Sequence, residues 1–223
     1  HPKSADGSLT PGSAELDEGV LAEPPPARSV GLAALNALLP EPAGRISERN
    51  AGDLAAERGA GRTVGVVGWF PFIPQLRQAA ARVEIFEQDP AGGFALTPER
   101  TERLARCDGL CITASALLNG TLDGLLQAAR PGAWKLLVGP SAPLCRAVLD
   151  LGFDAVCGAR VRDPGPVVRV LQEGGCFQQM RQTGAVRLLT LEACRRPAEP
   201  RQGASGSRRE HAGGPLPKKP QTT

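Results

Sequence analysis

The chain has 223 residues and a formal net charge of +3, and 41% of its residues are apolar, which allows one domain of good size or two small ones. Residues 29–194 carry 17 basic and 16 acidic side chains, so the basic excess lies at the ends and no basic face for nucleic acid is expected. No apolar run approaches the ~18 residues that a membrane span needs, which argues against a transmembrane protein.

The two ends differ from the middle in composition. Residues 1–28 hold five prolines and five acidic residues without a sustained apolar period, and residues 193–223 hold five prolines and seven basic residues. Neither stretch has enough apolar surface to offset the entropy lost on ordering. We therefore expect a disordered proline-rich segment over 1–28 and a disordered basic tail over 193–223.

The six cysteines favour a reducing compartment. They form no CxxC pair, and several of them lie inside apolar runs, so free thiols fit better than a disulfide framework. Cys107 and Cys111 flank or enter such a run, where we expect them to act as small buried hydrophobes. A cytoplasmic location is expected.

The middle of the chain alternates apolar runs with helical patterns. The runs lie at residues 62–68, 83–87, 109–113, 135–139, 154–158 and 185–191. Continuous apolar strands that alternate with helices are typical of a parallel sheet covered on both faces. The sequence therefore predicts an α/β fold over residues 61–192, with a doubly wound, mainly parallel, Rossmann-like sheet of about six strands.

Each predicted strand except the last is followed by a helix start with recognisable chemistry. The starts are marked by Pro71 and Pro74, by Thr97-Pro98, by Thr121, by Ser141 with Pro143, and by Asp163-Pro164. Threonine and aspartate cap helix starts, and proline suits the first turn because its missing N–H has no intrahelical partner there. Capping is the preferred interpretation for Thr121 and Asp163, and Gly174-Gly175 is expected to end the last helix.

Ligands of such sheets bind beyond the carboxyl ends of the strands, near the point where strand order reverses. After the first strand, Gly65 and Gly68 lack the third glycine of the dinucleotide fingerprint and precede Trp69-Phe70, so ordinary NAD binding is disfavoured. The two rings would form an aromatic floor for a flat ligand, or one of them would pack in the core. Glu87 ends the second strand, where contact with a ribose, coordination of a cation and pairing with an arginine are equally compatible.

Five blocks of the sequence match a known family in the same order. They are VGVVGWFPFIPQLR (64–77), VEIFEQDP (83–90), ITASALLNGTLDGLL (112–126), LLVGPSAPL (136–144) and DAVCGARVRDP (154–164). By these blocks the chain resembles the family of heavy-metal chelation domains, first defined as a domain of unknown function. The resemblance covers about residues 29–191 and implies a Rossmann-like domain beside an enolase-amino-terminal-like partner domain, with the site between the two.

The resemblance also implies a set of ligand-binding residues at the strand ends. They are Gly68, Phe70 and Pro71 after the first strand, Glu87 after the second, Thr113, Ser115, Asn119 and Thr121 after the third, Gly139, Pro140 and Ser141 after the fourth, and Asp163. Thr113, Ser115 and Asn119 are short hydrogen-bonding groups suited to a carboxylate, a phosphate or an amide, although Asn119 also suits a plain turn. We expect Glu87, Asn119 and Ser141 to converge around one crevice.

The chain departs from the family pattern at three places. The small, threonine-rich stretch after the third strand reads Ala114-Ser115-Ala116, and Trp69 stands where many members have a smaller or polar residue. Of the partner domain only its end, SVGLAALNALLP (29–40), is recognisable. Residues 29–60 are therefore interpreted as a remnant of the partner domain followed by a linker helix.

The sequence offers few side chains that could act as metal ligands. Both histidines, His1 and His211, lie in the tails, and soft metals would need thiolates. Cys145 is expected in a first helical turn at the strand-end edge, where a thiol pKa would fall. Glu87 and Cys145 are thus weak metal candidates, and a metal bound as a chelate or in a tetrapyrrole-like ligand would need fewer protein ligands.

Three functions are compatible with these observations, and whether the chain is an enzyme is left open. The first is metal handling or binding of a small anionic ligand in the strand-end cleft, with a heavy-metal ion or a metal chelate as the ligand. The second is an enzyme that binds a nucleotide-like cofactor there, with Glu87 on the ribose. The third is a truncated protein that only associates with a partner or forms a homodimer through its exposed docking surface.

Overall fold

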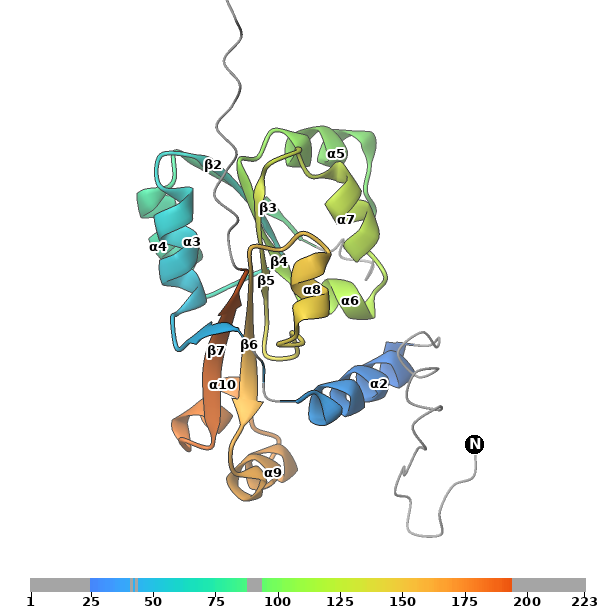
Figure 1. The fold of residues 1–223 in the computed structure, drawn as a ribbon, viewed down its shortest axis with the longest axis vertical. Coiled ribbons are helices and arrows are strands. Elements are labelled where there is room, and N and C mark those ends of the chain that lie inside the picture. Colours follow the sequence, from blue (N-terminus) through green and yellow to red (C-terminus); the bar gives the residue numbers. More distant parts are fainter. Residues whose placement is uncertain (1–24, 41, 43, 88–93, 194–223) are drawn as a thin grey trace, which may run out of the picture.

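A computed structural model describes residues 25–40, 42, 44–87 and 94–193 of the chain. One seven-stranded sheet runs through this part, and helices cover both of its faces (Figure 1). The strands are β1 (Arg45–Ser47), β2 (Thr63–Val67), β3 (Arg82–Phe86), β4 (Gly109–Thr113), β5 (Trp134–Val138), β6 (Ala155–Val161) and β7 (Val186–Glu192). The predicted class, an α/β fold with a mainly parallel sheet, is confirmed.

The strand order is β1-β7-β6-β5-β4-β2-β3. The strands from β6 to β3 in that order are parallel to their neighbours, whereas β7 runs antiparallel to both β6 and β1. The chain leaves β2 to form β3 on one side and then returns to form β4 on the other. The order therefore reverses at β2, and this switch point is where open α/β sheets place their ligands.

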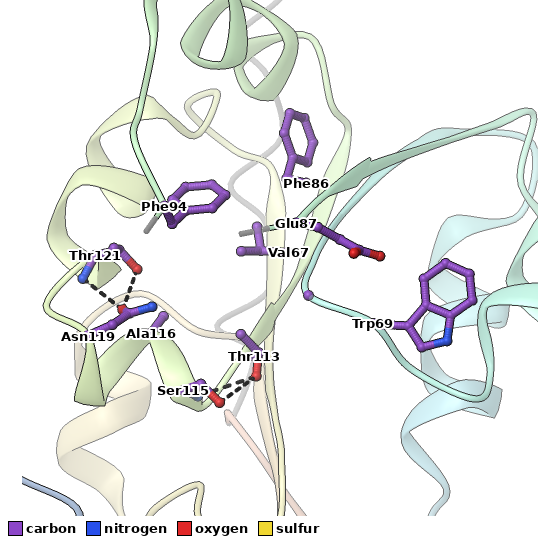
Figure 2. Close-up of a pocket in the computed structure, with 11 residues that line it drawn as sticks. Val67, Trp69, Phe86, Glu87, Phe94, Thr113, Ser115, Ala116, Asn119 and Thr121 are labelled. Carbon is purple, nitrogen blue, oxygen red and sulfur yellow. Dashed lines mark hydrogen bonds between the residues drawn. The ribbon is translucent and has the colours of Figure 1, made fainter. Parts of the chain in front are cut away.

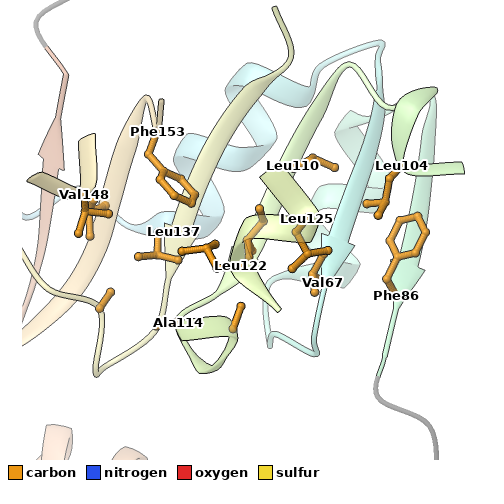
Figure 3. Close-up of a cluster of buried hydrophobic side chains, with 14 of the residues drawn as sticks. Val67, Phe86, Leu104, Leu110, Ala114, Leu122, Leu125, Leu137, Val148 and Phe153 are labelled. Carbon is orange, nitrogen blue, oxygen red and sulfur yellow. The ribbon is translucent and has the colours of Figure 1, made fainter. Parts of the chain in front are cut away.

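Each face of the sheet has its own core. On one face α5 (Pro98–Ala105), α7 (Leu122–Ala128) and α8 (Arg146–Asp150) cover a cluster that includes the fully buried Leu110, Leu125 and Leu137 (Figure 3). On the other face α3 (Ala51–Gly59) and α4 (Ile73–Ala79) cover a cluster that includes Leu54, Leu76 and Leu136. Since both faces are buried, the central strands have no polar face, and this is why they read as continuous apolar runs.

The sheet has one strand more than expected, and its last strand is antiparallel. β1 was missed because three residues reading Arg-Ile-Ser carry no strand pattern; the strand exists because Ile46 pairs with Leu191 of β7. The direction of β7 follows from the connection through α9 (Pro164–Gln172) and α10 (Phe177–Gln182), which brings the chain back beside β6 from the opposite end. Neither feature leaves a local trace in the sequence.

The helix caps agree with the sequence in part. Thr97 Oγ1 accepts a hydrogen bond from Arg100 N at 3.2 Å, and Asp163 Oδ1 accepts one from Gly165 N at 2.9 Å, so both cap as expected. The stop at Gly174 is confirmed as well, because α9 ends at Gln172 and Gly174 has a φ of +72°. Thr121 precedes α7, but its side chain makes no capping bond, so that prediction was wrong.

The helix expected to open at Ser141 begins later. Residues 139–145 form turns in which Ala142 N donates to Gly139 O and Cys145 N donates to Pro143 O. α8 then starts at Arg146, with Cys145 as its N-cap residue. In a helix capped by Ser141 the N–H of Cys145 would bond to Ser141 O, but it bonds to Pro143 O, and Ser141 O accepts a hydrogen bond from Asn36 Nδ2 at 2.9 Å. Cys145 was expected in the first turn of a helix, but it precedes that turn, so this prediction was wrong.

Three helices lie where the sequence indicated no helix start. α6 (Ser115–Leu118) and α10 are short, and α2 (Pro25–Leu38) begins inside the segment expected to be disordered. A proline at the start suits α2, and Arg28 Nη1 donates to Leu118 O at 3.2 Å. The other residues expected to be disordered, 1–24 and 194–223, lie outside the described residues. No helix of the described ranges has the length and apolar character needed to cross a membrane.

The segment before residue 61 shares its sheet and core with the segment after it. β1 pairs with β7, and Leu54 and Ala55 of α3 are fully buried in the second core. Arg58 of α3 lies 3.1 Å from Asp154 through Nη1, a charge contact without hydrogen-bond alignment, and 3.3 Å from Glu192 through Nη2. The boundary expected at residue 61 thus does not coincide with a gap in packing.

Candidate functional site

In the described part of the chain, three hollows adjoin the carboxyl ends of the parallel strands. The switch-point pocket, of about 350 Å³, lies beyond β2, β3 and β4. The α10 hollow, of about 400 Å³, lies between the start of α3, the helix α10 and the strands β5, β6 and β7. The α2 hollow, of about 690 Å³, lies between α2 and the segments 140–144 and 159–164. The single crevice expected from the sequence is therefore divided into separate spaces.

The turn after β2 builds one side of the switch-point pocket. Gly68 has a φ of +96°, and its N–H donates to Phe86 O at 2.8 Å, which closes the turn against β3. A Cβ at this position would lie 3.2 Å from Cβ of Thr113 on the other neighbouring strand. The turn thus needs glycine for its backbone and for its close approach to Thr113.

An exposed ring follows this turn. Trp69 is 64% exposed although it is the bulkiest side chain of the pocket. Phe70, the next residue, is half-buried and packs against the second core. Of the two aromatic residues, one therefore serves packing, and the indole is left as a flat wall that faces solvent.

Glu87 stands directly after β3 and lines the same pocket. Its carboxylate points towards Trp69, away from Asn119 and Thr121 (Figure 2). Within the described part of the chain Glu87 makes no hydrogen bond or ion pair, so the expected alternative of an arginine partner finds no support among these residues. It is the only ionisable side chain that lines the pocket in the described residues.

Two hydrogen-bonded pairs follow β4. Thr113 Oγ1 accepts a hydrogen bond from Ser115 N at 3.3 Å and lies 3.3 Å from Ser115 Oγ. Asn119 Oδ1 accepts hydrogen bonds from Thr121 N at 3.1 Å and from Thr121 Oγ1 at 2.7 Å. The Asn119 oxygen is therefore occupied, while its NH₂ group is left to donate to a ligand. These short polar groups are oriented by one another before any ligand arrives.

Apolar side chains complete the pocket. Phe86, Phe94, Val67 and Ala116 line it, and Phe94 lies on the same side as Thr121 and Asn119 (Figure 2). Arg103 stacks over the Phe86 ring, with its Cζ atom 5.0 Å from the ring centroid. Arg103 also donates to the buried Glu84, from Nε at 3.0 Å. The hydrogen bonds from Arg103 hold the pKa of Glu84 below its ordinary value, with Arg82 acting in the same direction.

The other predicted site residues lie elsewhere. Phe70, Pro71, Gly139 and Pro140 line the α10 hollow, and Pro140 also borders the α2 hollow. Ser141 lines the α2 hollow, where its carbonyl oxygen accepts a hydrogen bond from Asn36 Nδ2 at 2.9 Å. Asp163 caps α9 and lines none of the three spaces. Glu87 and Asn119 thus share a pocket, and Ser141 does not join them, in contrast to the expected convergence.

The cysteines of the described ranges do not assemble a metal centre. In the residues that the structure describes, no three His, Cys, Asp or Glu side chains gather closely enough to hold a metal ion. Cys107 and Cys111 are buried, as expected, and burial raises the pKa of both thiols, that of Cys107 to about 11. Cys145 is half-buried against the first core and lines none of the hollows. Cys194, His1 and His211 lie outside the described residues.

The sequence did not single out every side chain that lines the switch-point pocket. Phe94 enters it from the segment before α5, and Phe86 and Val67 enter it from the last positions of β3 and β2. Strand-end position is a signal that could have identified Val67 and Phe86. Phe94 lies in a connection of no regular structure and gives no such signal.

The sheet order and the polar groups at its switch point define a doubly wound α/β domain with a pocket at the strand ends. Residues 50–190 match the profile of the DUF364 family, whose description is "Putative heavy-metal chelation", and the chain belongs to this family. The resemblance proposed from the sequence blocks is thereby confirmed.

Solved structures of the same family have a similar fold. A protein of unknown function from Desulfitobacterium hafniense DCB-2 is 24% identical, with a TM-score of 0.63 over 79% of this chain and 72% of that one. Another, from Pyrococcus horikoshii, is 19% identical, with a TM-score of 0.69 over 83% of this chain and 77% of that one. At such identities the likeness concerns the fold alone. No protein with a curated description matches the chain.

Proposed function

We propose that this chain is a metal-handling protein that binds a metal as a preformed chelate in the switch-point pocket. The observation that carries the proposal is the carboxylate of Glu87, which has no partner among the described residues and lies between an exposed indole and a set of oriented hydroxyl and amide groups. The description of the family supports a role with heavy metals. A bare ion fits the described residues poorly, because a metal site built by the protein alone needs three or four ligands.

The charge and the side chains of the pocket lining indicate which kind of chelate the pocket would bind. Its described lining has one acidic and no basic side chain, so a chelate with positive charge is better matched than an anionic one. Trp69 offers a flat face for a cationic or aromatic group. The NH₂ group of Asn119 and the hydroxyl groups of Thr113 and Ser115 would then hydrogen-bond to the acceptor atoms of the organic part.

Calorimetric titration of the full chain tests this proposal. The probes are nickel(II) chloride, the cationic nickel(II)–bipyridine complex, the anionic nickel(II)–nitrilotriacetate complex, and free bipyridine. We expect saturable binding of the cationic complex, and about tenfold weaker binding to Glu87→Gln, since a charge-assisted contact is lost. Glu173→Gln, at an exposed glutamate after α9, is the matched control and should bind as the wild type does.

The proposal is rejected by the absence of saturable binding of any nickel species, or by equal affinity of the wild type and Glu87→Gln for the cationic complex. Preferential binding of nickel(II) chloride would instead show that the protein supplies a complete ligand set, which contradicts a role limited to chelates.

A second function is favoured by the position of Glu87. The residue follows the second parallel strand, beside the glycine turn of the first, where nucleotide-binding sheets place the acid that contacts ribose. An enzyme with a nucleotide-like cofactor would use the same pocket. Thermal-shift measurements with NAD, NADP and S-adenosylmethionine test it: stabilisation should occur with one of them and be lost in Glu87→Ala. If none raises the melting temperature, this function is discarded.

A further inference from the structure

The α10 hollow lies on the face of the sheet opposite to the switch-point pocket. Val138 and Cys157, which line it, belong to the core beneath α3 and α4, whereas Val67 and Phe86 of the switch-point pocket belong to the other core. On this face α3 packs against β4 and β5, and α10 contacts β7, which is separated from β5 by β6 (Figure 1). The hollow is the space left between the two helices.

Aromatic and aliphatic side chains line the hollow. The rings of Phe70 and Phe72 are stacked with their centroids 5.0 Å apart and their planes 9° from parallel. Phe177 of α10 and Leu188 of β7 line the hollow from the other side; both are half-buried, and neither belongs to either core cluster. Their apolar surface is therefore not packed in a core and is only partly exposed to solvent. An apolar ligand in the hollow would bury it.

One cation of the described lining has a side chain that is left for a ligand. Arg181 of α10 lines the space, and its guanidinium makes no hydrogen bond or ion pair within the described part of the chain, although its carbonyl oxygen accepts one from Gly184 N. Arg49, the other lining arginine, is paired with Glu57. Among the described residues no aspartate or glutamate lines the hollow. Thr190, which is fully buried there, already donates its hydroxyl to Arg49 O at 2.8 Å. The electrostatic preference of the space is thus for a single negative charge.

We propose that the α10 hollow is a second ligand site, which binds a small aromatic monocarboxylate. The aromatic ring lies against Phe72, Phe177 and Leu188, and the carboxylate pairs with Arg181, whose planar guanidinium matches a carboxylate with two parallel hydrogen bonds. A cavity of about 400 Å³ is within the size range of small-molecule sites. The site is independent of the chelate proposed for the switch-point pocket.

Three probes with one skeleton test the class of ligand. They are phenylacetate, 2-phenylethanol and 2-phenylethylamine, each titrated into the full chain labelled with ¹⁵N and followed by the amide resonances. Phenylacetate should bind with a Kd on the order of 1 mM, as expected for so few atoms. It should shift amides that line the hollow, such as Gly139, Gln178 and Leu188, and leave those of Thr113 and Asn119 in place. The alcohol should bind more weakly than the acid, and the amine should not bind.

A pair of arginine variants tests the role of Arg181. Arg181→Gln should weaken phenylacetate binding about tenfold, because a charge-assisted contact is removed. Arg169→Gln changes an exposed arginine of α9 outside the hollow and should leave the Kd unchanged. Phe177→Ala, which removes part of the apolar wall, should also weaken binding. Circular dichroism establishes that each variant is folded.

The proposal is overturned if phenylethylamine binds as well as phenylacetate, if both arginine variants bind phenylacetate like the wild type, or if the shifted amides surround the switch-point pocket. Equal losses in Arg181→Gln and Arg169→Gln would also overturn it, since they would indicate a general charge effect. Nickel-chelate binding is tested separately, by comparing the wild type with Glu87→Gln, a change in the switch-point pocket on the other face of the sheet.

Discussion

The switch-point pocket and the α10 hollow lie on opposite faces of one sheet, near the same ends of its strands, and yet they have opposite chemistry. The pocket has one carboxylate, hydroxyl and amide groups and no basic side chain in its described lining. The hollow has two arginines, three phenylalanines and no acidic side chain in its described lining. The carboxyl-end edge of this doubly wound sheet is therefore not a single site. The residues that follow the strands are divided between two spaces, one on each face of the sheet.

The turn after β2 makes this division. Gly68 and Trp69 line the switch-point pocket, whereas Phe70 and Pro71, the next two residues, line the α10 hollow. The chain crosses from the edge of the sheet to the face covered by α4 within this turn. A contiguous motif can thus serve two spaces, and motif position alone does not say which residues act together.

Removal of the Arg58 charge should have the largest effect on stability, because Arg58 connects α3 with β7 and with the turn before β6, in the sheet that carries both spaces. Arg58 is 10% exposed and joins α3 to Asp154 and Glu192. Arg58→Ala leaves both carboxylates without their partner, and we expect a loss of about 3 kcal/mol in the free energy of unfolding. Urea denaturation measures it. Arg77→Ala, on the exposed side of α4, should change the stability by less than about 0.5 kcal/mol.

If Arg58→Ala were as stable as Arg77→Ala, the ion pairs seen between α3 and the last strands would contribute nothing. Binding in both spaces should fall together in Arg58→Ala, and only to the extent that the protein unfolds. If Arg58→Ala lost ligand binding in only one of the two spaces, Arg58 would not support both of them.

A change at the glycine turn should distinguish the two spaces. Gly68→Ala places a side chain at a φ of +96° and 3.2 Å from Thr113, so we expect a loss of about 2 kcal/mol. Nickel–bipyridine binding should weaken while phenylacetate binding remains. Gly61→Ala is the matched control: its φ is +66°, but a Cβ there meets nothing within 4 Å. It should cost about 1 kcal/mol and leave both ligands bound.

Acid should weaken the contact between Glu84 and Arg103, which lies beside the wall of the switch-point pocket, and should thereby lower the stability of the protein. The pKa of Glu84 is lowered from 4.5, chiefly by hydrogen bonds from Arg103, which also stacks over Phe86 of the pocket wall. A carboxyl with a depressed pKa in the folded state stabilises the protein above its unfolded pKa. That stability is lost as the pH falls through the lower, folded value. Urea midpoints between pH 7 and pH 3 measure the effect.

Glu84→Gln should flatten this pH dependence, whereas Glu173→Gln, at an exposed glutamate after α9, should leave it as in the wild type. Identical pH profiles for the wild type and Glu84→Gln would show that the Arg103 contact does not stabilise the folded protein. Phenylacetate binding at pH 5 should not differ from that at pH 7, since no acidic residue is known in the described lining of the hollow.

A cap outside both spaces should have the smallest effect. Asp163→Ala removes the hydrogen bond from Gly165 N at the start of α9, for an expected loss of about 1 kcal/mol. Thr97→Ala removes the corresponding bond at the start of α5 and should cost about as much. Neither change should alter the affinity for nickel–bipyridine or phenylacetate by more than twofold. A large loss of either ligand in Asp163→Ala would place this residue in a site instead.

The alternation of apolar runs and helix starts was sufficient to predict the class of fold and the bounds of its main strands. β4 was expected at 109–113 and is found at Gly109–Thr113, and the other five predicted strands are shifted by one to three residues at an end. These features are local: a strand buried on both faces needs apolar residues in succession, and a cap needs its side chain within one turn. The same reasoning placed polar residues such as Glu87 and Asn119 at strand ends.

Features that depend on distant segments were beyond such reasoning. β1 is a strand because β7 lies beside it, and β7 is antiparallel because the connection through α9 and α10 returns it from the far end. Ser141 parts from Asn119 because the segment after β5 turns towards α2, where it accepts the hydrogen bond from Asn36. Pairing and burial across the chain are contacts between residues far apart in sequence, and a local pattern carries no information about them.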